Sequence, residues 1–152
     1  MNFFEIDHTA TARLKAKGID SMGRRKNLCL IAEDLGKGKL VDVLKANKSW
    51  DQSARTVILS EGLVMYLPPE AVRYLFGQCA AVTGNGSRIA FSYIPAGADA
   101  RPDAGRWTGL MLRLQEVAGE PWTWSIRPDE LSLFPEETVW TIAFEGVGTK
   151  NL

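Results

Sequence analysis

The chain has 152 residues, of which 45% are hydrophobic and 24% charged, and this composition is typical of one globular domain that buries its own core. The 18 basic and 18 acidic residues cancel, so no overall field attracts nucleic acid or an anionic membrane. No apolar run approaches the roughly 18 residues of a membrane span, and the acidic N-terminus MNFFEIDH does not resemble a signal peptide. These features predict a single cytoplasmic domain over residues 1–152.

Apolar runs alternate with helical patterns along the chain. The runs predict strands at residues 3–6, 27–32, 56–60 and 88–94, with a final strand at 138–146. The expected helices cover residues 8–18, 39–47, 68–79 and 107–117, with a helical turn at 128–134. Strands that alternate with helices favour an α/β fold, in which a parallel sheet is covered by helices on both faces.

Three of the expected helices carry specific sequence signals. Gly18 closes the first helix. Pro68 and Pro69 open the third, because proline is favoured in the first turn. The apolar positions of the third helix are Val72, Leu75, Phe76 and Cys79. Those of the fourth are Trp107, Leu110, Met111, Leu114 and Val117. This spacing predicts that each of these two helices buries one face.

Cys29 and Cys79 lie far apart and outside any CxxC motif, so neither a zinc site nor a redox pair is expected. We interpret both as small buried hydrophobic residues. No metal site is predicted.

An acidic residue follows each of the first three strands: Asp7 in EID, Glu33 and Asp34 in AED, and Glu61 in SEG. The carboxyl ends of parallel strands share one edge of the sheet, where open α/β sheets bind their ligands. A carboxylate there accepts hydrogen bonds from a ribose diol or an adenine amino group. Alternatively, each acid caps the next helix by accepting from its free backbone N–H groups. Three such acids in succession favour ligand binding.

Several segments together resemble the leucine carboxyl methyltransferase-like family, whose bacterial branch consists largely of S-adenosylmethionine-dependent methyltransferases. They are FFEIDHTATARLKAKGI, CLIAEDL, ILSEGLVMYLPPEAV and GSRIAFSYI, and later GEPWTWSIRPDEL. The most specific is SEGLVMYLPPEAV. The resemblance implies a Rossmann-like class I methyltransferase sheet and S-adenosyl-L-methionine as cofactor. It also implies methyl transfer, to oxygen of a carboxylate or of another small-molecule or peptide acceptor.

Carried over to this chain, the resemblance assigns four cofactor contacts. Asp7 would hold the ribose hydroxyls, and Asp34 and Leu35 would flank the adenine. Glu61 would face the cofactor at the mouth of the reaction site. No general base is assigned, because a carboxylate acceptor is already ionised at pH 7. His8 is the only histidine, and it adjoins the ribose ligand at the start of a helix rather than carrying chemistry.

Three aromatic residues are candidates for substrate binding. Tyr66 could touch the substrate, or it could pack against the following helix. Trp122 and Trp124 alternate with small polar residues, so they form either an aromatic wall over the substrate or a cover for the sheet edge. The sequence alone does not distinguish the substrate-binding roles from the packing roles.

The family pattern also begins with a strand and a glycine-rich cofactor turn, which this sequence lacks. Two glycine pairs do not replace this turn. The pair in LGKGK (35–39) lacks the phosphate-loop spacing, and the pair in TGNGS (83–87) precedes a strand, so it is interpreted as a turn. We therefore expect an N-terminally incomplete sheet, with open edges on the strands that end at Asp7 and Glu61, and a homo-oligomer that covers them. The alternative function is a non-catalytic, truncated methyltransferase-like module that oligomerises or binds. A nicotinamide dehydrogenase is disfavoured because a dinucleotide fingerprint is lacking.

Overall fold

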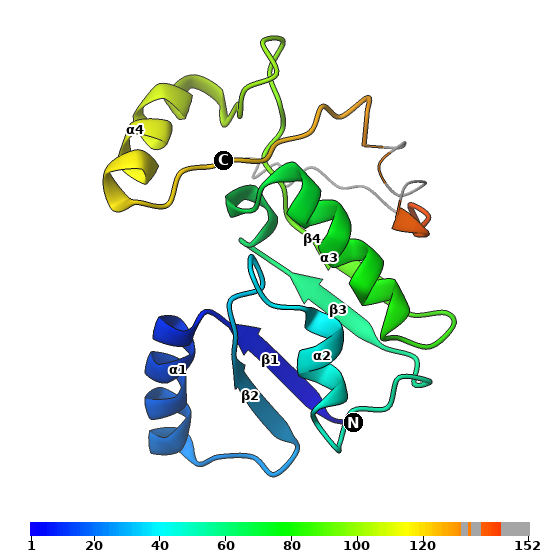
Figure 1. The fold of residues 1–152 in the computed structure, drawn as a ribbon. Helices are drawn as coiled ribbons and strands as arrows, with labels where there is room; N and C mark the ends of the chain where they lie inside the picture. The colour runs from blue at the N-terminus through cyan, green and yellow to red at the C-terminus, as the bar shows by residue number, and fades with distance from the viewer. Residues whose placement is uncertain (132–133, 135–137, 144–152) are drawn as a thin grey trace, which may run out of the picture.

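The computed structural model describes residues 1–131, 134 and 138–143. Within them the elements alternate between strands and helices (Figure 1). The strands are β1 (Phe3–Asp7), β2 (Leu28–Ala32), β3 (Val57–Ser60) and β4 (Arg88–Phe91). The α-helices are α1 (Thr9–Met22), α2 (Leu40–Lys45), α3 (Pro69–Ala81) and α4 (Thr108–Ala118). Two short 3₁₀-helices are η1 (Val64–Tyr66) and η2 (Gly105–Trp107). The predicted α/β class is confirmed.

The first helix runs past the residue that was expected to end it. Gly18 lies inside α1, which continues to Met22 and is followed by Gly23 at φ 89°. The reason is that an interior glycine only weakens a helix, by up to about 1 kcal/mol, whereas a positive φ at the helix end suits glycine specifically. The third helix begins at Pro69, as the proline pair predicts.

The strands form two separate parallel ladders. β1 pairs with β2 from Phe3↔Leu28 to Asp7↔Ala32, and β3 pairs with β4 from Val57↔Arg88 to Ser60↔Phe91. The open edges expected on the strands that end at Asp7 and Glu61 are observed within the described residues, because β1 and β3 are not paired with each other. The described part of the chain supplies no strand to bridge the two ladders. Within these residues each ladder therefore consists of two strands only.

The two ladders differ in how they are covered. α1 packs against β1 and β2 through its buried Ala12. On the opposite face of that ladder, the ring of Phe4 meets Trp50 edge to face at 4.9 Å. The β3–β4 ladder buries one face under α3, but Val57 and Leu59 are 70% and 78% exposed. The expected cover of helices on both faces is therefore observed only in part.

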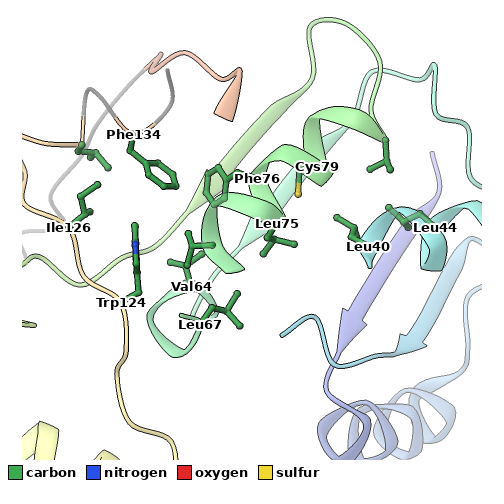
Figure 2. Packing of buried hydrophobic residues seen from close by; sticks show 13 residues of the cluster. Leu40, Leu44, Val64, Leu67, Leu75, Phe76, Cys79, Trp124, Ile126 and Phe134 are labelled. Carbon is green, nitrogen blue, oxygen red and sulfur yellow. The ribbon is translucent and has the colours of Figure 1, made fainter. Parts of the chain in front are cut away.

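The main hydrophobic core runs along α3 (Figure 2). Leu75 and Cys79 lie toward Leu40 and Leu44 of α2, which connects the core to the β1–β2 side. At the other end, Phe76 meets the rings of Phe91 and Phe134 edge to face, at 4.9 and 5.1 Å. The remaining core members are Val64, Leu67, Val72, Val82, Trp124, Ile126 and Leu131. Thus α3 joins both halves of the chain.

The prediction that α4 buries an apolar face is wrong. Leu110, Leu114 and Val117 are 53%, 55% and 81% exposed, and the helix has no buried residue. In Figure 1 α4 lies apart from both ladders. Helical periodicity shows which face is apolar, but burial needs an opposing surface, and the described residues provide none.

The C-terminal predictions fall partly outside the described residues. A turn at 128–131 is present, with the N–H of Leu131 donating to the carbonyl of Arg127 at 3.1 Å, and this confirms the start of the expected helical turn. Of the strand expected at 138–146, residues 138–143 are described and adopt no strand, while 144–146 lie outside the described residues. A strand at 138–143 is therefore not observed.

Candidate functional site

Asp7 ends β1, and its carboxylate is held by the start of the next helix. Its Oδ1 accepts from the backbone N–H of His8 at 2.8 Å. Its Oδ2 lies 2.8 Å from Nζ of Lys15, and this ammonium also lies 2.6 Å from Oε1 of Glu5. The hydrogen bonds to Asp7 and then Glu5 raise the pKa of Lys15. Asp7 therefore lies in a charged cluster at the strand end.

Asp34 lies just beyond the end of the neighbouring strand. The two strand ends are joined by a hydrogen bond from the N–H of Glu33 to the carbonyl of Asp7, at 2.9 Å. Lys37 lies 3.1 Å from Oδ2 of Asp34, and the N–H of Gly36 donates to Oδ1 at 3.0 Å. The hydrogen bond to Lys37 and then the one to Gly36 lower the pKa of Asp34. The structure thus brings Asp7, His8 and Asp34 to one place.

The glycine pair of LGKGK shapes the turn that carries Asp34. A Cβ on Gly36 would lie 3.2 Å from Oδ1 of Asp34 and 3.6 Å from Leu67. A Cβ on Gly38 would lie 2.6 Å from Oε1 of Glu33, which is too close unless that side chain moves. These glycines therefore make room for the acidic side chains of the turn, and the contact with Leu67 places the turn against the segment that follows β3. Leu35 in the same turn is half-buried against the core.

Glu61 follows β3 and is exposed. The next residue, Gly62, has φ 62°, and its N–H donates to Oγ of Ser92 at 2.9 Å. This turn holds the end of β3 against the end of β4. Within the described residues no hydrogen bond or ion pair joins Glu61 to Asp7 or Asp34. Glu61 therefore shares the carboxyl-end position of the other acids without bonding to them, and its cofactor contact stays a prediction.

The three aromatic candidates lie along η1 and the segment beside it. Tyr66 belongs to η1 and is half-buried. The N–H groups of Thr123 and Trp124 donate to the carbonyl of Met65 at 2.8 and 3.2 Å, so the two segments are adjacent. Trp124 is 6% exposed and packs on Phe134, with ring centroids 5.6 Å apart. Trp124 is therefore buried in the core, and the substrate roles of all three aromatics stay predictions.

The indole nitrogen of Trp122 has no hydrogen-bond partner in the described residues. The side chain of this tryptophan is half-buried, and the nitrogen itself is buried. Oγ of Ser60, at the end of β3, is also buried without a partner in the described part of the chain. A buried polar group usually has a hydrogen-bond partner, and for these two atoms the described residues supply none.

Lys15 is the functional-site residue that sequence reasoning missed. The sequence alone assigned it no role in the site. A signal was present, because Lys15 lies three residues after Ala12 and so shares a helix face with it. Ala12 is buried against the ladder, so Lys15 is directed toward the charged end of β1.

The two cysteines have different environments. Cys79 is buried, and this burial raises the pKa of its thiol to about 12, which confirms its interpretation as a buried hydrophobic residue. Cys29 is only half-buried, and its Sγ accepts from Nδ2 of Asn47 at 2.9 Å. Among residues 1–131, 134 and 138–143, no group of three His, Cys, Asp or Glu side chains is arranged to hold a metal ion.

The geometry defines an α/β protein whose acidic residues follow the carboxyl ends of parallel strands. A sequence model of the leucine carboxyl methyltransferase family matches residues 1–80. The chain therefore belongs to the leucine carboxyl methyltransferase family. None of the helices in the described part of the chain is long and apolar enough to span a bilayer.

Curated relatives carry the name "Putative S-adenosyl-L-methionine-dependent methyltransferase". One from Mycobacterium sp. (strain JLS) is 33% identical over 97 residues, which are 60% of this chain and 30% of that relative. Another, from Mycolicibacterium vanbaalenii, is 33% identical over 97 residues, or 62% and 31% of the two chains. A third, from Mycobacterium ulcerans, is 41% identical over 56 residues, or 37% and 18%. In the longer alignments the chain spans about a third of the length of these relatives.

Proposed function

We propose that this chain contributes the adenosine-binding strand ends of an S-adenosyl-L-methionine-dependent methyltransferase. The observation that carries the proposal is the joint placement of Asp7 and Asp34 at the ends of two hydrogen-bonded parallel strands. Open α/β sheets bind ligands at this edge. Membership of the family and the names of its relatives agree with that ligand class.

The hydrogen-bond acceptors of the site suit the nucleoside part of this cofactor. An ionised carboxylate offers about four acceptor positions, and the structure assigns two of them on Asp7 and two on Asp34 to neighbouring groups. Each acid therefore keeps acceptor capacity, and their side chains are 28% and 35% exposed. In this proposal Asp7 accepts from the ribose hydroxyls and Asp34 and Leu35 flank the adenine.

The cofactor supplies a methyl group that is already activated as part of a sulfonium ion. The residues of this chain then have to align the acceptor and exclude water. Glu61 would face the cofactor, and Tyr66, Trp122 and Trp124 would line the acceptor side. A carboxylate oxygen is ionised at neutral pH, so it needs no general base, and O-methylation of a small-molecule or peptide carboxylate is the proposed reaction.

A Rossmann-like sheet is the proposed architecture of the complete site. No described residue pairs with the inner edges of β1 and β3, and the two arrows run in the same general direction in Figure 1. One further parallel strand between them would join both ladders into a single sheet. Such a strand would also give Val57 and Leu59 a neighbour.

Calorimetric titration with S-adenosylhomocysteine tests the proposal. We expect saturable binding with a Kd between about 10 μM and 1 mM, because the described residues provide contacts for the nucleoside but no glycine-rich turn for the amino-acid part. Uridine, which has the ribose without adenine, is the control and should bind at least about tenfold more weakly. Absence of saturable binding by S-adenosylhomocysteine would contradict the proposal.

The second candidate function is a non-catalytic module that oligomerises. The favouring observation is the open inner edges of β1 and β3 beside the exposed Val57 and Leu59. Unpaired strand edges promote pairing with another chain, and two identical chains carry the same edges. A homo-oligomer in light scattering over a concentration series, combined with no binding of S-adenosylhomocysteine, would favour this candidate over the enzyme.

A further inference from the structure

We propose that Lys15 is a positioning residue that fixes the Asp7 carboxylate for ribose recognition. The inference rests on the proposed function, because it assumes that Asp7 meets the ribose of an adenosine-type ligand. It goes further by assigning the selectivity for ribose over deoxyribose to a residue of α1 that does not itself touch the ligand.

The geometry of Lys15 carries the first step. Its Nζ lies 2.8 Å from Oδ2 of Asp7 and 2.6 Å from Oε1 of Glu5. These are short, charge-assisted contacts, which are stronger and more directional than neutral hydrogen bonds. One ammonium group therefore connects two carboxylates of β1 to the second turn of α1.

The electrostatics of β1 supply the second step. Glu5 and Asp7 are two residues apart on one strand, so their side chains project from the same face, roughly 7 Å apart at the backbone. Two carboxylates at that separation repel each other, and the ammonium of Lys15 offsets the repulsion. Without Lys15, the Asp7 side chain would be pushed to rotate away from Glu5.

The third step concerns which acceptor positions are left for a ligand. His8 donates to Oδ1 of Asp7 while Lys15 donates to Oδ2, so each oxygen is held by one donor and keeps a further acceptor position. A carboxylate fixed in this way meets the ligand without losing rotamer freedom on binding. Such pre-organisation improves affinity and geometric selectivity.

The experiment compares adenosine with 2′-deoxyadenosine by ligand-observed NMR titration of the 152-residue chain. The wild type should prefer adenosine by about tenfold, the effect of one charge-assisted hydrogen bond. In Lys15→Met, which keeps the apolar stem, the preference should fall to about twofold or less. Lys15→Arg should restore it, because a guanidinium spans both carboxylates. Lys17→Met changes an exposed lysine of the same helix and should leave the preference unchanged.

Different outcomes separate this inference from the proposed function. If the wild type binds and prefers adenosine while Lys15→Met keeps the same preference, the positioning role is wrong and the proposed function stands. If Lys15→Met binds adenosine more tightly, Lys15 competes with the ligand for Asp7, and the inference is also overturned. If the wild type binds neither nucleoside, both fail. Circular dichroism checks that each variant is folded, and Lys15→Gln replaces Lys15→Met if the latter is not.

Discussion

Replacing Asp7 by alanine is expected to weaken binding of S-adenosylhomocysteine by about tenfold or more. The reason is the loss of hydrogen bonds to a charged acceptor, which contribute about 1.5–3 kcal/mol, and each 1.4 kcal/mol is about tenfold in Kd. Asp7 is 28% exposed at the end of β1, so a ligand can reach it. Calorimetry on the wild type and the variant measures the effect.

The control for this variant is Asp20→Ala, which removes an exposed carboxylate of α1 while leaving the net charge equal to that of Asp7→Ala. It should leave the Kd unchanged. The Asp7–Lys15 pair is partly exposed, and such pairs contribute at most about 1 kcal/mol to stability, so Asp7→Ala should remain folded. Equal affinities of a folded Asp7→Ala variant and the wild type would exclude Asp7 as the ribose ligand.

Replacing Phe76 by alanine is expected to lower the free energy of unfolding by about 3–5 kcal/mol. Phe76 is 2% exposed and meets both Phe91 and Phe134 edge to face. The substitution therefore removes a large apolar side chain and leaves a cavity where α3, β4 and the C-terminal segment meet (Figure 2). Urea unfolding followed by tryptophan fluorescence measures the loss.

Tyr74→Ala is the matched control, because Tyr74 belongs to the same helix but is 53% exposed. It should change the free energy of unfolding by no more than about 0.5 kcal/mol. Phe76→Leu keeps most of the volume and should cost less than the alanine variant. A loss below about 1 kcal/mol in Phe76→Ala would mean that the core is not organised around α3.

The local elements were predictable because their signals are short-range. The first four of the five predicted strands correspond to β1–β4, and the proline pair marks the start of α3. The end of α1 was predicted too early, at Gly18. The helix continues to Met22, and Gly23 is the glycine that follows its end, with a positive φ. Which glycine follows the helix end depends on φ values that composition does not show.

The long-range arrangement was less predictable. The exposure of Leu114 and Val117 on α4 depends on what opposes that helix, which periodicity cannot reveal. The open edges of β1 and β3, in contrast, were expected from the resemblance to the family, and the described residues do not pair these strands with each other. For α4 the apolar face was predicted correctly, and the lack of an opposing surface in the described residues determined its exposure.

The part of the candidate site that lies at the ends of the parallel strands was predictable from the sequence. The positions of Asp7 and Asp34 follow from the register of β1 with β2. The contribution of Lys15 was not predicted, because it depends on the rotation of α1 about its axis and on a side chain that reaches back to β1. Surface lysines are usually solvated, and the spacing of Lys15 from Ala12 became informative only once Ala12 was seen to be buried.

The central claim is that an adenosine-type ligand binds where the carboxyl ends of β1 and β2 meet. The backbone N–H groups of His8 and Gly36 donate directly to Asp7 and Asp34, so they report on both carboxylates. Amide chemical shifts of the ¹⁵N-labelled chain, followed during a titration with S-adenosylhomocysteine, are the most direct test. If the ligand binds there, the amide signals of His8 and Gly36 will be among those that shift most, and they will saturate together. Saturable shifts confined to α4 and residues 97–108, with His8 and Gly36 unchanged, would contradict it.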